Sequence, residues 1–377
     1  MRKLVLGIAI CITYFSGIAY AEEQTSTHTK KTADSVPYVL PWTYEIDFRS
    51  DIQQQDYKLV VRFPPGYNES EEGFPVIYIL DGQYHYPLVS AAHGNYAWDG
   101  TIPNAITVGI SWAGENLNVE ALRLLNFTPS QSKNQKLSGG ADAFIKVLKE
   151  EIIPFVEGHY KTNNSRTITG SSLSGLFSLY VMTKEPALFN NIVALSPSMW
   201  WENREIDNLL KAHFDKTDLP PVKIYAARGE YELYGMGEND KMFRDLMSDL
   251  NGNIGIRYDI VEGAGHSGVN PQGFARGLRY VFGRNELPIS EIEKQRMAGI
   301  YISDNKMVPK VELQSDANGL YFDDGQSNKI YVHSHSDSEF YINEFNADVA
   351  FLELKDKKYQ KVKVSPLNQG DIVYTRQ

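Results

Sequence analysis

Short apolar runs alternate with segments of helical spacing between residues 74 and 282, and this alternation constrains the fold more than any other feature. The run Phe74–Leu80 is almost entirely apolar, which suits a strand buried on both faces. Residues 140–160 instead repeat apolar side chains at helical spacing. The alternation predicts an α/β fold, with a doubly wound, mostly parallel sheet between two helical layers. Further strands are expected at Ala105–Ile110, Arg166–Thr169, Asn191–Leu195, Val222–Ala227 and Ile254–Val261, and helices at Leu173–Thr183, Lys241–Leu250 and Phe274–Phe282.

The segments before and after this region have other patterns of secondary structure. Two strands at residues 44–48 and 58–63 are expected to pair as an antiparallel edge of the sheet. After Gly283 a short helix, Ile289–Met297, precedes short alternating strands broken by Asp, Gly and Asn. This pattern predicts a small all-β domain, a barrel or sandwich. We therefore expect an α/β domain over residues 38–285 and a small β-domain with its linking helix over residues 286–377.

The first residues have the pattern of a secretory signal peptide. Two basic residues precede an apolar run, Leu4–Ile18, and the small-x-small site Ala19-Tyr20-Ala21 follows it. The run is short for a bilayer span of about 20 residues, so we expect cleavage after Ala21 and no stable membrane insertion. Residues 1–21 are then the signal peptide and residues 22–37 a polar, flexible linker. The predicted location is the periplasm or the exterior.

Cysteine usage and charge exclude several classes of function. The one cysteine, Cys11, lies inside the predicted signal peptide, so the mature chain would have none. Cysteine nucleophiles, zinc–thiolate sites and iron–sulfur clusters are thereby excluded. The formal net charge of −10 also argues against a nucleic-acid partner, which would be met by a basic surface.

A strand running into a helix through small residues marks the candidate nucleophile. The stretch Gly170-Ser171-Ser172-Leu173 fits the first four places of the G-x-S-x-G nucleophile elbow of α/β-hydrolases. Ser174 takes the fifth place, and the glycine follows at Gly175. The serine third from the start of the motif stands at the apex of the turn, so Ser172 is the predicted nucleophile. The backbone N–H of Leu173, at the start of the helix, would then face the developing oxyanion.

A histidine between glycines follows the last predicted strand of the sheet. His266 lies in Gly265-His266-Ser267-Gly268, where α/β-hydrolases carry their general base, and the chain order serine, acid, histidine is respected. The acid should follow strand Val222–Ala227. We choose Glu232, while Glu230, Glu238 and Asp240 stay open as alternatives.

The second oxyanion donor is expected after the buried strand at Phe74–Leu80. There the sequence reads Asp81-Gly82-Gln83, so the backbone N–H of Gly82 or Gln83 would supply it. Asp81 is interpreted as a turn residue whose side chain bonds to its own backbone.

From about Trp42 to Gly283 the chain resembles the esterase family that includes enterochelin esterases, S-formylglutathione hydrolase, feruloyl esterases and mycolyltransferases. The segment Ser196-Pro-Ser-Met-Trp-Trp201 is most similar to the siderophore-hydrolase-like branch, which implies hydrolysis of trilactone or other siderophore esters. That branch carries its acid in a Gly-Glu-x-Glu stretch, which matches Gly229–Glu232 and favours Glu232. Two positions depart from the family pattern: Ser174 replaces glycine, and Asn126 replaces aspartate. The matching segments are Val76–Gly82, Arg123–Pro129, Gly170–Gly175, Leu195–Trp201 and Gly265–His266.

These residues together predict a secreted serine esterase that cleaves carboxylic esters through an acyl-enzyme and without a cofactor. The family resemblance implies a siderophore ester as the substrate. A feruloyl or acetyl carbohydrate esterase, an acyltransferase and a non-catalytic binding protein on an esterase scaffold stay open as alternatives. Trp200 and Trp201 are candidates for a substrate pocket, and Arg123 for an anionic substrate or for a protein carboxylate. His333, His335 and Asp337 share one face of a strand but are interpreted as a solvated edge, so no metal is expected. The partner is a small-molecule ester, and the oligomeric state stays open.

Overall fold

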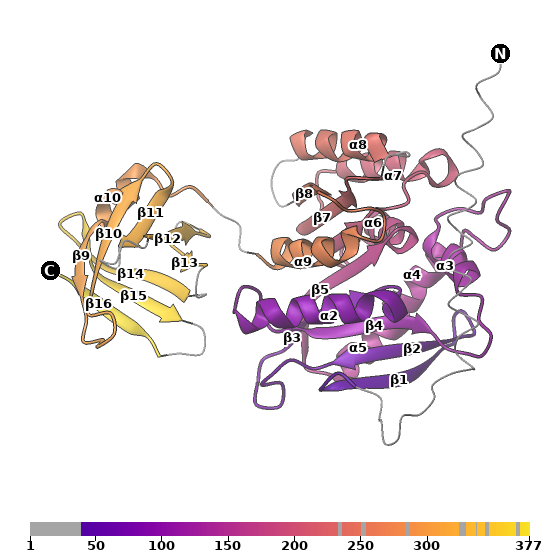
Figure 1. Ribbon diagram of the computed structural model, residues 1–377, viewed down its shortest axis with the longest axis horizontal. Coiled ribbons are helices and arrows are strands. Elements are labelled where there is room, and N and C mark those ends of the chain that lie inside the picture. The colour runs from indigo at the N-terminus through magenta and orange to yellow at the C-terminus, as the bar shows by residue number, and fades with distance from the viewer. Residues whose placement is uncertain are drawn as a thin grey trace, which may run out of the picture. The chain divides into compact units, whose positions relative to one another are not determined.

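The computed structural model describes residues 39–232, 236–249, 254–283, 287–323, 329–336, 338–343, 347–366 and 370–377 (Figure 1). The predicted signal peptide and linker, residues 1–21 and 22–37, lie outside the described residues. No helix within the described residues is both long and apolar enough to cross a membrane.

The first domain is built on an eight-stranded sheet in the order β1-β2-β4-β3-β5-β6-β7-β8. The two opening strands pair antiparallel with each other and β2 pairs antiparallel with β4, whereas the pairs from β4 to β8 are parallel. The expected α/β-hydrolase sheet with an antiparallel edge is therefore confirmed. Its strands are β1 Thr43–Ser50, β2 Gln55–Arg62, β3 Phe74–Ile79, β4 Ile106–Trp112, β5 Thr162–Ser171, β6 Asn191–Leu195, β7 Val222–Gly229 and β8 Ile254–Val261.

Helices cover both faces of this sheet because successive residues of the buried strands point to opposite sides. On β3, Tyr78 packs into a core with side chains of α4 and α6, whereas Ile77 packs into a second core with α2 and α9. The latter two helices also contact each other (Figure 1). The helices are α2 Gly82–Trp98, α3 Val119–Phe127, α4 Ala141–Lys146, α5 Ile153–His159, α6 Leu173–Lys184, α7 Glu205–Phe214, α8 Met236–Asp249 and α9 Val269–Phe282, with a 3-10 turn, η3, at Trp201–Asn203.

The single helix predicted over residues 140–160 is instead three consecutive pieces. A π-helical segment, η2 (Val147–Ile152), separates α4 from α5. Pro154, which has no N–H to donate, stands in the first turn of α5. The π-helical segment comes directly before the turn that holds Pro154, because a regular α-helical hydrogen bond could not continue through a residue without an N–H.

The C-terminal domain is a closed barrel of eight antiparallel strands, which confirms the predicted β-barrel. Its core includes Met297 from α10 (Glu291–Met297). Closure depends on β9 and β16, which pair Ile302 with Thr375 and Tyr301 with Arg376 and so leave no free sheet edge. The strands are β9 Gly299–Ile302, β10 Lys310–Asp316, β11 Gly319–Asp323, β12 Lys329–Ser334, β13 Phe340–Ile342, β14 Ala347–Lys355, β15 Lys358–Pro366 and β16 Ile372–Arg376.

Candidate active site

The turn between β5 and α6 holds Ser172 in a conformation that few side chains adopt. Its backbone has φ 60° and ψ −117°, while α6 begins at the next residue. A Cβ atom on Gly170 would lie 2.4 Å from the carbonyl oxygen of Ser174, so only glycine fits where the helix folds back on the strand. The bend therefore lifts the partly exposed Ser172 out of the strand at the carboxyl end of β5.

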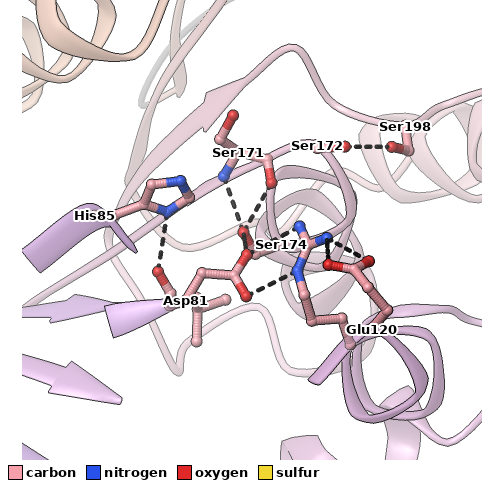
Figure 2. A network of polar contacts seen from close by, with 9 residues as sticks. Asp81, His85, Glu120, Ser171, Ser172, Ser174 and Ser198 are labelled. Atoms are coloured by element: carbon pink, nitrogen blue, oxygen red, sulfur yellow. Dashed lines mark hydrogen bonds and ion pairs between the residues drawn. The ribbon is translucent and has the colours of Figure 1, made fainter. Parts of the chain in front are cut away.

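The glycine of the elbow motif is displaced by one residue for a steric reason. A Cβ atom on Gly175 would lie 2.8 Å from the carbonyl oxygen of Leu195, because α6 passes close to the end of β6. Ser174, one residue earlier, is fully buried and has room for its hydroxyl. That hydroxyl accepts a hydrogen bond from the Ser171 N–H at 2.9 Å and donates to the Asp81 carboxylate at 2.7 Å (Figure 2). The serine thus adds contacts that glycine could not make.

The segment after β6 lies beside Ser172. The Ser172 N–H donates to the Leu195 carbonyl at 2.9 Å, and the Ser198 N–H donates to the Ser172 carbonyl at 3.1 Å. The hydroxyl oxygens of Ser172 and Ser198 are 3.2 Å apart (Figure 2). The Ser-Pro-Ser segment is therefore a direct neighbour of the candidate nucleophile.

Glu232 is the carboxylate that meets His266. Its Oε2 lies 2.6 Å from His266 Nδ1, and its Oε1 accepts hydrogen bonds from the Ser196 hydroxyl at 2.5 Å and the Gly229 N–H at 2.7 Å. Burial works against the charged carboxylate, but the hydrogen bonds from His266, Ser196 and Gly229 together hold the pKa of Glu232 below its ordinary value. The site therefore holds an ionised carboxylate against the imidazole.

The other acidic candidates have different partners. Asp240 forms an ion pair with Arg228 at 2.7 Å, and this pairing lowers the pKa of Asp240. The Glu230 carboxylate accepts from the Gly263 N–H at 2.8 Å, and that of Glu238 lies 3.5 Å from Arg204. Ser196, which supports Glu232, was missed by the sequence reasoning. The sequence feature that could have identified Ser196 is its position directly after the buried strand β6.

His266 stands in the loop after β8 with about half of its side chain exposed. A hydrogen bond to a carboxylate favours the tautomer with the proton on Nδ1, and this tautomer has its lone pair on Nε2. Within the described residues no hydrogen bond joins the His266 ring to the Ser172 hydroxyl. The two are linked through intervening contacts: Ser172 to the segment 195–198, Ser196 to Glu232, and Glu232 to His266. The adjacent parallel strands β5, β6, β7 and β8 are followed in turn by Ser172, Ser196, Glu232 and His266.

Backbone donors are available at two helix N-termini next to this edge. The N–H groups of Tyr84 and His85 donate to the Asp81 carbonyl, whereas those of Gly82, Gln83 and Leu173 have no acceptor among the described residues. A Cβ atom on Gly82 would lie 2.9 Å from the Ile110 nitrogen, which explains the glycine. Because β3 and β5 are adjacent, the predicted oxyanion donors start from neighbouring strands.

The candidate substrate residues separate into exposed and buried ones. Trp200 is 55% exposed, whereas Trp201 is 3% exposed and its indole N–H donates to the Ser130 carbonyl at 3.1 Å. One of the two tryptophans is thus available to a ligand and the other belongs to the core.

Arg123 contacts protein carboxylates, which is one of the two roles that the sequence analysis left open for it. Its Nε and Nη2 donate to the two oxygens of Asp81 at 2.9 and 3.1 Å, and its Nη1 donates to Glu120 at 3.1 Å. The guanidinium is therefore engaged by the protein and is not free for an anionic substrate. The interpretation of Asp81 as a turn residue was wrong: its carboxylate binds Arg123 and Ser174 because a buried charge requires partners.

The histidines of the barrel do not form a metal site with other described residues. No group of three His, Cys, Asp or Glu suited to a metal ion occurs in the described part of the chain. Asp337 lies outside that part. The His333 ring stacks on Tyr341, with their centroids 5.3 Å apart.

With this geometry in place, comparison with known proteins identifies the family. The family model "Putative esterase" matches residues 50–247, more than half of the chain. The chain belongs to this esterase family. The ferri-bacillibactin esterase BesA of Bacillus subtilis is 28% identical to this esterase over 279 residues, which cover 69% of this chain and 96% of BesA.

Solved structures show the same fold as this esterase. The BES protein from Bacillus cereus aligns with a TM-score of 0.60 at 24% identity, covering 67% of this chain and 99% of that protein. The siderophore hydrolase EstB from Aspergillus nidulans aligns with a TM-score of 0.57 at 20% identity, covering 66% of this chain and 98% of EstB. The family and the α/β-hydrolase fold are thus confirmed, and the chain is an ester-hydrolysing enzyme.

Proposed function

We propose that this esterase is a serine hydrolase, with Ser172 as nucleophile, His266 as general base and Glu232 as the acid that orients the histidine. The observation that carries the proposal is the 2.6 Å contact between the buried Glu232 and Nδ1 of His266, at the same sheet edge as the strained Ser172 turn. A half-exposed histidine held by a buried carboxylate is the arrangement that serine hydrolases use.

The proposed reaction is acyl transfer to water. Nε2 of His266 takes the proton of the Ser172 hydroxyl as its oxygen attacks the ester carbonyl, and the C–O bond to the alcohol breaks when His266 returns that proton to the leaving oxygen. Water then attacks the acyl-enzyme in the same way and releases the acid. The N–H groups of Leu173 and of Gly82 or Gln83 hold the oxyanion. One such donor is worth about 3 kcal/mol.

We further propose that the substrate is a siderophore ester such as a trilactone. BesA is named a ferri-bacillibactin esterase and EstB a siderophore hydrolase, and these names support the proposed substrate class. Trp200, exposed two residues after Ser198, offers an aromatic surface for the aryl groups of such a ligand.

The test uses a fluorophosphonate probe, which reacts with activated serines whatever the substrate. Labelling is expected in the wild type, lost in Ser172→Ala, and retained in Ser198→Ala, the matched control whose hydroxyl is 3.2 Å away. Loss in the second variant alone would move the nucleophile to Ser198. An unlabelled wild type would contradict the serine mechanism and favour a binding protein.

The substrate proposal has its own measurement. Purified protein is offered a trilactone siderophore, a feruloyl sugar and p-nitrophenyl acetate, and kcat/KM is compared among them. The trilactone should have the highest value. A feruloyl sugar that is preferred over it would contradict the siderophore assignment and leave the serine mechanism intact.

Export is a separate proposal that rests on residues 1–21. The leader pattern favours a mature protein that starts at Glu22 and acts in the periplasm or outside the cell. Mass spectrometry of the N-terminus of the protein from an exported fraction tests it. A chain that keeps Met1 would contradict cleavage.

A further inference from the structure

A buried polar cluster adjoins the residues that carry the candidate oxyanion donors, and the proposed mechanism does not use it. It consists of Asp81, Arg123 and Ser174, which are joined by hydrogen bonds. Figure 2 labels Asp81 and Ser174. The Asp81 side chain is completely buried, and that of Arg123 is 14% exposed. A charged pair at such a depth loses much hydration, so its retention needs a reason beyond stability.

The cluster connects three parts of the domain. Asp81 stands between β3 and α2 with φ 51°, Arg123 comes from α3, and Ser174 belongs to the first turn of α6. Arg123 binds both carboxylate oxygens of Asp81, and Ser174 adds a hydrogen bond to Oδ2. A bidentate arginine fixes the direction of a carboxylate as well as its position.

The Ser174 hydroxyl carries the connection on to the nucleophile turn. Its single proton has two acceptors in reach, the Asp81 carboxylate at 2.7 Å and the Ser171 carbonyl at 2.9 Å, and the ionised oxygen is the stronger. Its oxygen accepts the N–H of Ser171, the residue before Ser172. One side chain therefore joins Asp81 to the strand end that bears the nucleophile.

From this geometry we infer that Asp81, Arg123 and Ser174 are positioning residues that fix the distance between the two halves of the oxyanion hole. The first half, the N–H groups of Gly82 and Gln83, follows Asp81 directly. The second half, the N–H of Leu173, precedes Ser174. The inference rests on the proposed serine mechanism, because only a developing oxyanion needs both halves at once.

Electrostatics explains why the arginine is part of the cluster. An unpaired carboxylate on Asp81, the residue directly before the donors Gly82 and Gln83, would repel the negative charge that develops on the oxyanion. Burial disfavours the charged guanidinium, but Asp81 and Glu120 hold the pKa of Arg123 above its ordinary value, so the guanidinium stays charged. The guanidinium covers both oxygens of Asp81 and thereby neutralises its field.

The experiment compares Ser174→Ala with Ser178→Ala in the full chain. Ser178 is a matched control: it is equally buried, lies one turn further along α6, and among the described residues its hydroxyl bonds only to the Ser174 carbonyl. The rate constant of fluorophosphonate labelling should fall about tenfold in Ser174→Ala, because misplaced donors stabilise the tetrahedral phosphorus less. It should stay at the wild-type value in Ser178→Ala. On p-nitrophenyl acetate kcat should fall with KM unchanged.

The labelling rate separates positioning from mere folding. A purely structural role would reduce the fraction of molecules that label, while the folded ones would still react at the wild-type rate. Wild-type labelling rates in Ser174→Ala would overturn this inference and leave the serine mechanism standing. An unlabelled wild type would overturn the serine mechanism and this inference with it.

A second variant tests the cluster as a unit. Asp81→Asn keeps the shape and the tolerance for positive φ but removes the charge. If Asp81 and Ser174 act through their mutual hydrogen bond, the double variant should lose less rate than the product of the two single losses. Fully multiplicative losses would contradict the coupling.

Discussion

Nδ1 of His266 lies 2.6 Å from Oε2 of Glu232, and the other oxygen of that carboxylate is held by Ser196 and by the Gly229 N–H. The Glu232 side chain is 6% exposed, whereas the His266 side chain is 51% exposed. One partner is thus fixed by the core and the other is presented to solvent. This asymmetry lets the fold set the direction of a ring that, in the proposed mechanism, must also reach the substrate.

The first prediction concerns this contact. Glu232→Gln should lower kcat by roughly 10³- to 10⁴-fold, because an amide can hold the ring in the wrong tautomer and cannot stabilise its charged form. Steady-state kinetics on p-nitrophenyl acetate measure the effect. Glu230→Gln is the matched control, since Glu230 bonds to the Gly263 N–H and not to His266. Equal losses in the two variants would contradict the assignment of Glu232.

The choice of Glu232 illustrates what the sequence can predict. Four acidic candidates were considered after β7. Their order in the chain does not show which one contacts the histidine, because that depends on which side chain points into the protein. The resemblance to Gly-Glu-x-Glu favoured Glu232, and its burial next to His266 agrees with that choice. The elbow was predictable because its steric demand at Gly170 is local.

Contacts between residues far apart in the chain could not be predicted from the sequence. Asp81 and Ser174 are 93 residues apart, and no local pattern shows that they share a hydrogen bond. Arg123 was left with two interpretations for the same reason. In the barrel, β9 has only four residues and pairs with β16, which is distant in sequence, so no local pattern shows this pairing.

The second prediction links Ser196 to pH. Ser196→Ala removes a hydrogen bond that favours the charged form of Glu232, so the pKa of Glu232 in the folded state should rise. A lowered folded-state pKa stabilises the protein above the unfolded-state pKa, and this stabilisation disappears as the pH falls through the folded-state value. The variant should therefore be less stable than the wild type by about 1–2 kcal/mol at pH 7, with a smaller difference near pH 3. Urea unfolding at both pH values checks this, and a constant difference would contradict it.

The third prediction tests the steric demand of the elbow. Gly170→Ala should destabilise the protein by about 3 kcal/mol, because its Cβ would lie 2.4 Å from a backbone oxygen that cannot move without shifting α6. Gly158→Ala in α5 is the control, since nothing lies within 4 Å of the added carbon and a helix favours alanine. Thermal unfolding compares them. A Gly170→Ala protein as stable as Gly158→Ala would contradict a tight turn.

The fourth prediction separates the adjacent tryptophans. The rings of Trp200 and Trp201 lie 5.9 Å apart, but only Trp200 is exposed. Trp200→Ala should raise KM for aryl esters about 3- to 10-fold with little change in kcat, since stacking on a ring contributes equally to substrate and transition state.

Trp201→Ala should instead cost about 3–5 kcal/mol of stability, because it empties a core position and breaks the bond to Ser130. Kinetics on phenyl and methyl esters, together with thermal unfolding, distinguish the two roles. A KM change of equal size for methyl esters would show that Trp200 does not recognise aromatic groups. It would also remove the link between this exposed ring and an aryl-bearing siderophore.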